Sequence, residues 1–183
     1  MKATQILMEE HEVVLRVLDA MELELAKLKT GKAKPAFFLD AADFIKGFAD
    51  GCHHAKEEGV LFKYMEAAGV PSQNGPIAVM LADHEQGRLL TRQMREAALK
   101  WQVGDISAIS DVAQNAAAYA QLLRGHIFKE NNILFPMADR AINASEYQEM
   151  DDAFEHVEHE ETGEGVHEKY IALAEKLEKE AHS

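Results

Sequence analysis

The sequence predicts an all-α protein, an antiparallel up-down four-helix bundle with an additional C-terminal helical segment. No segment shows the sustained alternation of apolar and polar residues that marks a strand. Apolar residues instead recur at spacings of three and four over long stretches, which is the repeat of helices that pack in a bundle. The chain has only four prolines, and Pro35, Pro71 and Pro76 stand near glycines between the helical stretches. Short connections between long helices favour antiparallel neighbours.

The first helix is expected over residues 3–29, where the apolar row includes Leu7, Val14 and Leu18. The sequence KTGKAKP follows, and its glycine and proline end the pattern where helices usually stop. The second helix is expected to begin at Asp40 or Asp43, because aspartate is a favoured N-cap residue. It should run to about residue 68, before GVPSQNGP.

The third helix is expected over residues 76–102, ending near Gly104. The fourth should start at Ser107 or Ser110 and continue beyond residue 130, with Pro136 expected to kink or end it. The remainder, 145–181, is predicted as one or two helical pieces interrupted at ETGEG. We therefore expect residues 1–141 to form the bundle and 142–183 to form an extension that packs on it, within one domain.

Composition excludes several classes of partner. The formal net charge of −13 argues against binding nucleic acid or anionic membranes, which require surfaces rich in lysine and arginine. A single cysteine rules out an internal disulfide and suits a reducing compartment. The N-terminal stretch lacks the apolar run of a signal peptide, and no stretch approaches about 18 apolar residues. These features predict a soluble, cytoplasmic protein with no nucleic-acid or membrane partner.

One motif occurs twice. CHHAKEEGVLF at 52–62 and HIFKENNILF at 126–135 share the pattern H-x-x-K-E-x-x-x-L-F, which aligns His53 with His126 and Glu57 with Glu130. Side chains four residues apart lie one above the other on a helix, so each pair presents an imidazole and a carboxylate in the same direction. Both pairs fall in the stripes that the apolar pattern assigns to the interior.

His11 on the first helix and His84 on the third also lie in apolar stripes. A single histidine in such a stripe is most often a core residue, and a buried glutamate usually has a basic partner. Four imidazoles and two carboxylates in one core are different, because each desolvated charge costs several kcal/mol unless it is compensated. A pair of metal ions removes that cost. Imidazole together with bridging carboxylates favours iron, and bundle cores are where di-iron carboxylate centres occur.

Over residues 5–138 the sequence resembles the hemerythrin-like (HHE cation-binding) family, with His on the first helix, H-x-x-x-E on the second, His on the third and H-x-x-x-E on the fourth. CHHAKEEGVLF, NGPIAVMLADHE and HIFKENNILFP are particularly similar to bacterial di-iron proteins linked to repair of iron–sulfur and nitrosylated iron centres. The resemblance implies the hemerythrin-like bundle and two oxo- or hydroxo-bridged iron ions. The ligands that it implies are His11, His53, Glu57, His84, His126 and Glu130, with Glu57 and Glu130 bridging.

The register on the second helix has an alternative, because His54 and Glu58 form another H-x-x-x-E. We prefer His53 and Glu57, since their neighbours superpose on those of the second motif. The other pair is offset by one residue, a rotation of about 100° on the helix. Glu58 then either orients an imidazole through its second N–H or is a solvated charge.

A fifth imidazole is missing from the bundle pattern. Oxygen-carrying hemerythrins have H-x-x-x-H on the third helix, where this chain has Met80 at the first position, and the repair proteins have a histidine late in the first helix. Two six-coordinate irons offer about twelve positions, so five histidines leave one open and four leave two. Our candidate for the fifth is His167, because Gly163 and Gly165 allow a sharp turn beside it. The alternative is a surface histidine at a helix end.

The expected function is that of a non-haem di-iron protein that binds or reacts with O2, NO or peroxide. A non-catalytic iron or oxygen sensor, a metal-binding module that acts through an unidentified protein partner, is the alternative. A zinc or mixed-metal structural site is a third possibility. The sequence does not decide whether the protein is an enzyme.

Overall fold

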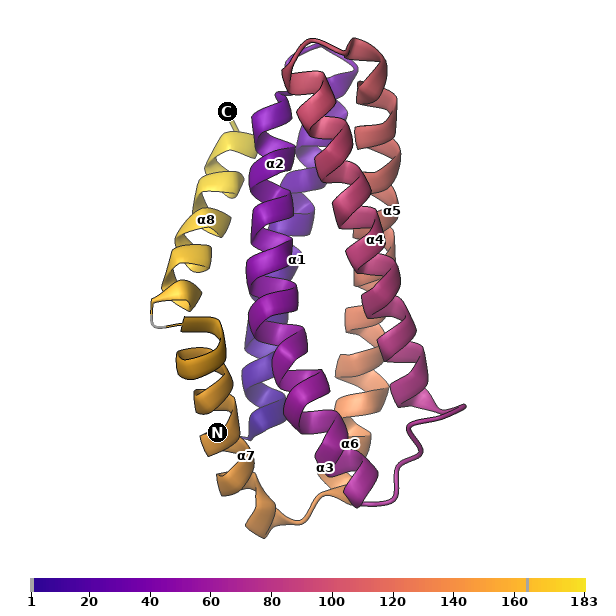
Figure 1. Cartoon of the computed structure of the whole chain (residues 1–183), viewed down its shortest axis with the longest axis vertical. Coiled ribbons are helices and arrows are strands. Elements are labelled where there is room, and N and C mark those ends of the chain that lie inside the picture. The colour runs from indigo at the N-terminus through magenta and orange to yellow at the C-terminus, as the bar shows by residue number, and fades with distance from the viewer. Residues whose placement is uncertain (1, 164) are drawn as a thin grey trace.

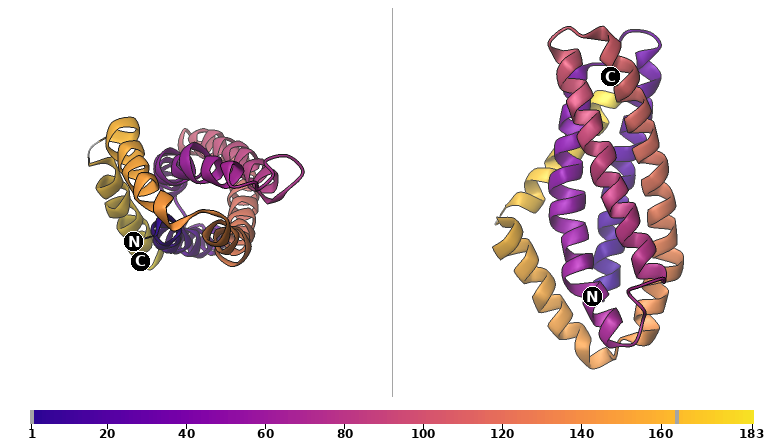
Figure 2. Two further views of the ribbon diagram at one scale, coloured as in Figure 1. Left: turned by 90° about the horizontal axis from the view of Figure 1, so that it is seen from below. Right: turned by 45° about the vertical axis from the view of Figure 1, so that its right-hand side comes forward.

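The computed structural model describes residues 2–163 and 165–183, and within them all regular structure is helical, with no strand. This confirms the all-α prediction. Four long rods surround a common centre, as the end-on view in Figure 2 shows. The first rod is α1 (Ala3–Leu28), and the third is α4 (Pro76–Gln102). The second joins α2 (Pro35–Phe44), η1 (Ile45–His54), η2 (Glu57–Leu61) and α3 (Phe62–Ala67). The fourth joins α5 (Ile109–Lys129), η4 (Glu130–Leu134) and α6 (Phe135–Ala141).

The observed starts of two rods differ from the predicted ones. The second begins at Pro35 rather than at Asp40 or Asp43, because proline at the first helical position has a suitable φ and lacks only an N–H that would be unpaired there. Before the fourth rod, the short 3-10 helix η3 (Ile106–Ala108) is capped by Asp105, whose carboxylate accepts a hydrogen bond from the Ser107 N–H at 3.1 Å. The first and third rods follow the predicted limits closely.

The fourth rod continues through Pro136, contrary to a helix end there. Pro136 is at the start of α6, directly after the π-helical turn η4. A π turn already replaces the regular i→i−4 bonding, so the missing N–H of the proline removes little. The second rod also contains a π-helical turn at this place in the motif, because η2 begins at Glu57 as η4 begins at Glu130. Both copies of the repeated motif thus contain a π turn that starts at their glutamate.

The C-terminal extension, residues 142–183, contains η5 (Ala144–Glu146), α7 (Tyr147–His156), η6 (Val157–Gly163) and α8 (Val166–Ala181). α7 and α8 lie along one side of the bundle, at the left of Figure 1. Both pack on α1, and α8 also packs on α2. Gly163 and Gly165 have φ of 110° and 77°, a left-handed backbone that glycine adopts without strain. These glycines lie within the predicted interruption at ETGEG, of which Glu164 is outside the described residues.

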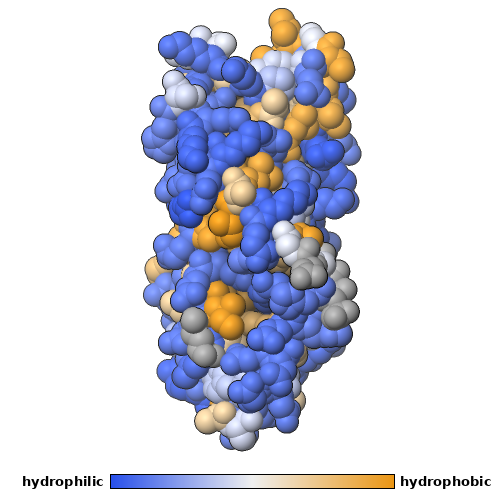
Figure 3. Space-filling model, turned by 90° about the vertical axis from the view of Figure 1, so that its left-hand side faces the viewer, coloured by the Kyte–Doolittle hydropathy of each residue, from blue (hydrophilic) through white to orange (hydrophobic). Residues whose placement is uncertain are grey.

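The extension docks through apolar side chains. Tyr170 and Leu177 of α8 are buried against the bundle, as are Met150 and Phe154 of α7. Tyr170 lies directly over Gly47 of the second rod, where a β-carbon would be 1.8 Å from the tyrosine Cζ. The outer surface on this side is mostly hydrophilic, with apolar patches between polar side chains (Figure 3). Among the described helices none is long and apolar enough to cross a membrane.

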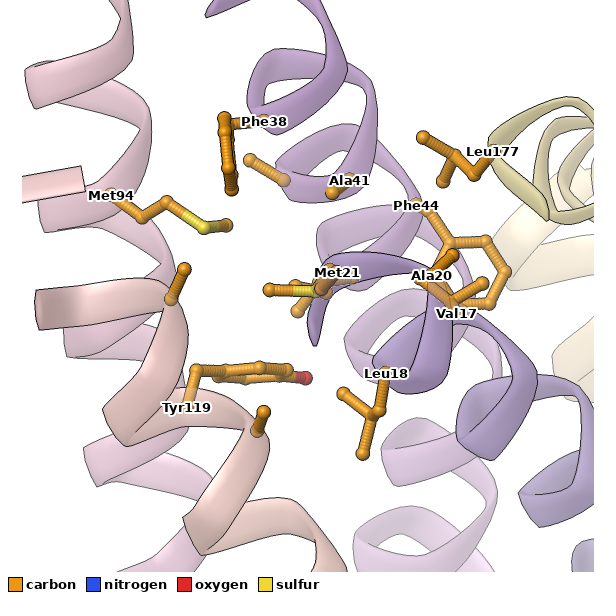
Figure 4. Close-up of a cluster of buried hydrophobic side chains, with 14 of the residues drawn as sticks. Val17, Leu18, Ala20, Met21, Phe38, Ala41, Phe44, Met94, Tyr119 and Leu177 are labelled. Carbon is orange, nitrogen blue, oxygen red and sulfur yellow. The ribbon is translucent and has the colours of Figure 1, made fainter. Parts of the chain in front are cut away.

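The apolar core consists of two clusters. The upper cluster, in the orientation of Figure 1, includes Met21, Phe38, Met94 and Tyr119, which converge in Figure 4. The lower cluster includes the leucine and phenylalanine of both motif copies, whose exposed fractions do not exceed 3%: Leu61, Phe62, Leu134 and Phe135. These side chains anchor the motif in an apolar layer. Polar side chains lie between the two clusters.

Candidate metal centre

Seven buried histidine and glutamate side chains meet inside the bundle, in two groups whose ligand atoms lie within 4.8 Å of one another. The two-histidine group consists of His11, His53, Glu57 and Glu130. The three-histidine group consists of His54, Glu57, His84 and His126. Exposed fractions in the seven side chains range from 0 to 5%. Because Glu57 belongs to both groups, they form one centre with two adjacent positions for cations.

The two carboxylates lie between the groups. Glu57 Oε1 is 3.4 Å from His53 Nε2, and its Oε2 is 3.3 Å from His84 Nε2. Glu130 Oε2 is 3.2 Å from His11 Nε2 and 3.1 Å from His126 Nε2. Each carboxylate therefore faces one imidazole from each group, which is the placement of a ligand that bridges two cations.

Several atoms of this centre lack hydrogen-bond partners within the described residues. They are both carboxylate oxygens of Glu57 and of Glu130, and the Nε2 atoms of His11 and His53. A buried polar atom without a partner costs about 1–3 kcal/mol, and a charged one costs more. Carboxylate oxygens and the Nε2 atoms of neutral imidazoles are electron-pair donors, so bound cations would satisfy all of them. The residues present therefore fit a pair of metal ions.

All five imidazoles are held from outside through Nδ1. Each Nδ1 lies within 3.4 Å of a carboxylate or amide oxygen, so the Nδ1–H donates and leaves Nε2 free to face inward. The pairs are His11 with Asn131 (2.7 Å), His53 with Glu10 (2.9 Å), His54 with Asp50 (2.9 Å), His84 with Glu58 (2.7 Å) and His126 with Asp83 (3.4 Å). Such outer partners fix the tautomer and orientation of metal-binding histidines.

His53 and His54 both face the centre, although they are neighbours in sequence. Adjacent residues of an α-helix point about 100° apart. Both residues lie in the π-helical segment η1, whose i→i+5 bonding widens the turn and brings successive directions closer. The His54 ring stacks on His84 with centroids 3.8 Å apart. In the sequence these histidines are alternatives, and the second H-x-x-x-E is the signal for His54.

Glu57 rather than Glu58 is the carboxylate shared by the groups, in line with the preferred register. Glu58 lies outside, where its Oε1 accepts hydrogen bonds from His84 Nδ1 and from Arg88 Nη2, each at 2.7 Å. It therefore orients an imidazole, one of the two roles considered for it. The other implied ligands, His11, His53, His84, His126 and Glu130, all lie in the two groups.

His167 lies elsewhere. It is half-buried on α8, with Nε2 3.9 Å from Glu10 Oε1 and Nδ1 3.9 Å from Glu158 Oε1, and it belongs to neither group. The reason is the position of α8, which packs on the outside of α1 and so directs His167 at the outer partner of His53. The five imidazoles that the structure brings together include His54 and not His167.

The charges inside the centre shift several pKa values. Burial lowers the pKa of His53, but the Glu57 and Glu10 carboxylates outweigh it and raise that pKa to about 10. Burial also lowers the pKa of His84, but the Glu57 and Glu58 carboxylates outweigh it and raise that pKa to about 9. Burial would raise the pKa of Glu57, yet His53 and His84 hold it well below its usual value. Without metal the centre therefore holds protons at neutral pH, and a cation has to displace them.

A cavity of about 10 Å³ lies beside the three-histidine group and is lined by Asp50, His84, Gly87 and Tyr119, among others. That volume is enough for about one water molecule. Tyr119 itself is buried in the upper cluster, where its ring lies near Leu18 and Met21 (Figure 4). Burial raises the pKa of its phenol well above the usual value, so the group stays protonated.

Comparison with known proteins agrees with this geometry. The family model described as hemerythrin HHE cation binding domain matches residues 2–138. Uncharacterised proteins from Mycobacterium bovis and from two strains of Mycobacterium tuberculosis are each 29% identical over 178 residues, which is 97% of this chain and 69% of each relative. No solved structure matches significantly. Because the matched region extends from α1 into α6 and carries all seven side chains of the centre, the chain belongs to the hemerythrin HHE cation-binding domain family.

Proposed function

We propose that this chain is a non-haem di-iron protein that binds or reacts with O2, NO or peroxide. The observation that carries the proposal is that Glu57 belongs to both ligand groups, which gives two adjacent sets of donors joined by one carboxylate. The two-histidine group would hold one iron and the three-histidine group the other, with Glu57 and Glu130 bridging. Bound iron supplies a redox-active Lewis acid that takes small ligands such as these.

The donor set supports iron better than structural zinc. Structural zinc sites are closed, four-coordinate and mostly built from cysteine and histidine. Here seven imidazole and carboxylate ligands serve two positions, and the single cysteine of the chain belongs to neither group. Carboxylates that can bridge, combined with imidazoles in a bundle core, are typical of di-iron centres.

The ligand count suggests where a small molecule would bind. The three-histidine side has three imidazoles and faces both carboxylates, and the two-histidine side has one imidazole fewer. A six-coordinate cation on the two-histidine side would therefore have one protein ligand fewer than its neighbour. The exchangeable position would therefore be on the two-histidine side.

The surroundings of the two-histidine group suit a small apolar or weakly polar ligand. Phe135 stacks on the His11 ring, with centroids 5.5 Å apart and an angle of 8° between the planes. Val14, Ala49, Leu123 and Ile127 line the space next to His11 and His53, which also borders His54 and His126. These apolar side chains surround the imidazoles, while Glu10 and Asn131 keep His53 and His11 in orientation.

The alternative is a sensor in which iron or oxygen occupancy acts through a protein partner. One observation favours it, namely that the C-terminal extension contacts the outer partner of a candidate ligand. Lys56 donates to Glu10 and also to Glu158 of η6. A change at the centre would therefore affect the packing of the extension through Glu10 and Lys56.

Metal analysis of the chain purified from its native host, under anaerobic and aerobic conditions, tests the proposal. We expect close to two irons per chain and, in air, the near-ultraviolet absorption of an oxo-bridged pair. Stopped-flow mixing of the reduced protein with O2, NO or peroxide then separates the alternatives. Consumption of any of them supports a reactive centre, and reversible binding without consumption supports a carrier or sensor. Absence of iron, or iron bound away from these side chains, would contradict the proposal.

A further inference from the structure

The lysine of the repeated motif has a defined place in the structure. In the first copy, Lys56 Nζ donates to Glu10 Oε1 at 2.5 Å, while Glu10 Oε2 accepts from His53 Nδ1 at 2.9 Å. Glu10 thus uses one oxygen for the lysine and the other for the imidazole. The lysine limits the positions that this carboxylate can adopt, and the carboxylate in turn holds the ring of His53.

The second copy repeats the arrangement with residues from another helix. Lys129 Nζ donates to Asp83 Oδ2 at 2.5 Å, and the same oxygen is 3.4 Å from His126 Nδ1. The contact to the imidazole is longer than in the first copy. The lysine is also more accessible, since the Lys129 side chain is 37% exposed and that of Lys56 is fully buried.

The C-terminal extension causes this difference. Glu158 of η6 accepts a second hydrogen bond from Lys56, with Oε2 3.0 Å from Nζ. The same ammonium group also lies over the Phe154 ring of α7, with Lys56 Nζ 5.9 Å from the ring centroid. The described contacts of Lys129 include no residue of the extension. The extension therefore encloses the lysine of one copy only.

A buried ion cluster of this kind does not by itself stabilise a fold. The free energy cost of removing an ammonium group from water is about as large as the stabilisation from its ion pairs. Proteins in which apolar side chains replace such pairs are often equally stable. What the arrangement does provide is a single orientation for Glu10, which has one oxygen on Lys56 and the other on His53. The two-histidine position has fewer imidazoles than its neighbour, so its affinity depends more on the orientation of each.

We propose that Lys56 and Glu158 are positioning residues for His53, through which the C-terminal extension raises the cation affinity of the two-histidine position. This inference rests on the proposed di-iron function. Glu158 does not contact Glu10 or His53 itself. Its shorter contact is to the Lys56 ammonium group, at 3.0 Å, and its contact with the His167 ring, which also faces Glu10, is 3.9 Å, so we expect it to act mainly through Lys56.

The test is an anaerobic titration of the metal-free, full-length chain with Fe²⁺ in competition with a chelator, which resolves two binding steps. The step that His53→Ala weakens identifies the two-histidine position. We expect Lys56→Met to weaken that step by about ten-fold, the lower end of the effect of losing an outer partner of a metal ligand, because Glu10 remains but loses the contact that orients it. Glu158→Gln should weaken it a few-fold, and the double variant should match Lys56→Met alone because both changes interrupt one contact path.

Matched controls separate positioning from a general effect on packing. Glu155→Gln changes an exposed acid on α7 and should leave both steps unchanged. Lys129→Met should act on the other step, and less strongly, because Lys129 is partly exposed. Lys56→Arg should restore most of the affinity, since it keeps the charge. Should Lys56→Met fail to fold, Glu158→Gln and Lys56→Arg still decide.

Three results would overturn the inference. They are equal weakening of both steps by Glu158→Gln, an effect of Glu158→Gln no larger than that of Glu155→Gln, and additive effects of the Lys56 and Glu158 changes. Failure of the proposed function has a different result, because the wild-type chain would then not bind two Fe²⁺ ions. If the wild type binds two and the variants match it, only the positioning role is wrong.

Discussion

The two copies of the H-x-x-K-E-x-x-x-L-F motif differ most in what surrounds them. In both, the glutamate starts a π turn, faces one imidazole from each group, and is followed by a leucine and phenylalanine packed in the lower cluster. The first copy adds a second inward histidine, His54, and its lysine is enclosed by the C-terminal extension. The second copy has Ile127 at the corresponding position and a partly exposed lysine. A repeated sequence thus produces the same local geometry, and the rest of the chain makes the two sides of the centre unequal.

The largest expected effect is a loss of iron from the two-histidine and the three-histidine group together. Glu57→Gln keeps the shape of the side chain but removes the charge that both groups share, so we expect loss of most bound iron at both positions. Iron per chain and the oxo-bridge absorption measure this. Glu58→Gln is the matched control, because Glu58 contacts only the outer nitrogen of His84 and Arg88 and should lower iron content much less. Full iron content in Glu57→Gln would mean that the two sides do not share this carboxylate.

The next largest expected effect is a loss of iron from the three-histidine group alone. His54→Ala removes one imidazole from the three-histidine group, so we expect iron content to fall toward one per chain and the spectrum of the coupled pair to disappear. His167→Ala should retain both irons and the spectrum, because His167 is 3.9 Å from Glu10 and outside both groups. The opposite pattern would restore His167 as the fifth imidazole and remove His54.

The pH dependence of stability should differ between the iron-free and iron-loaded protein. In the iron-free protein the pKa of His53 is raised from 6.5 to about 10, so its protonation stabilises the fold below pH 6.5 and that contribution is lost as the pH rises toward 10. His84, with a pKa raised to about 9, acts in the same direction. Iron requires both rings deprotonated, so its affinity should increase over this range.

Thermal unfolding of both forms between pH 6.5 and 9 measures this difference. The gap between the two unfolding midpoints should widen as the pH rises. Parallel curves would indicate that protons and iron do not compete for these imidazoles. His182→Gln, at the exposed end of α8, is the control and should leave both curves in place.

A smaller effect tests how the extension is docked. Gly47→Ala would place a β-carbon 1.8 Å from Tyr170 Cζ, so the buried Tyr170 ring has to move, with or without α8, at a cost of about 1–3 kcal/mol in the free energy of unfolding. Gly125→Ala, in α5 with nothing within 4 Å of its β-carbon, should instead stabilise the protein by about 0.5–1 kcal/mol. Denaturant unfolding of both variants gives the two values. Equal effects would show that Tyr170 does not hold the extension against the second rod.

The elements of the fold were largely predictable, because helix periodicity is a local property. The apolar spacing predicted four rods close to their observed limits, and the ends of α1 and α4 follow glycine and proline punctuation. The start of the second rod differs from the prediction, and of the two effects expected of Pro136, a kink or an end, the end does not occur. Pro35 and Pro136 each occupy a position where the missing N–H is tolerated, which depends on the surrounding hydrogen bonding, and the start of the fourth rod differs because Asp105 caps η3.

The sequence by itself determined that the chain is helical and that His11, His84 and the two H-x-x-x-E pairs face inward, because residues three and four apart share a helix face. Only the tertiary structure decided that His54 joins them, since that requires the π turns of the second rod, and that His167 does not, since α8 packs outside α1. It also selected the outer partners of the imidazoles, of which all but Asp50 come from another rod. Such pairings depend on how separate helices are aligned against one another, and no local repeat in the sequence specifies that alignment.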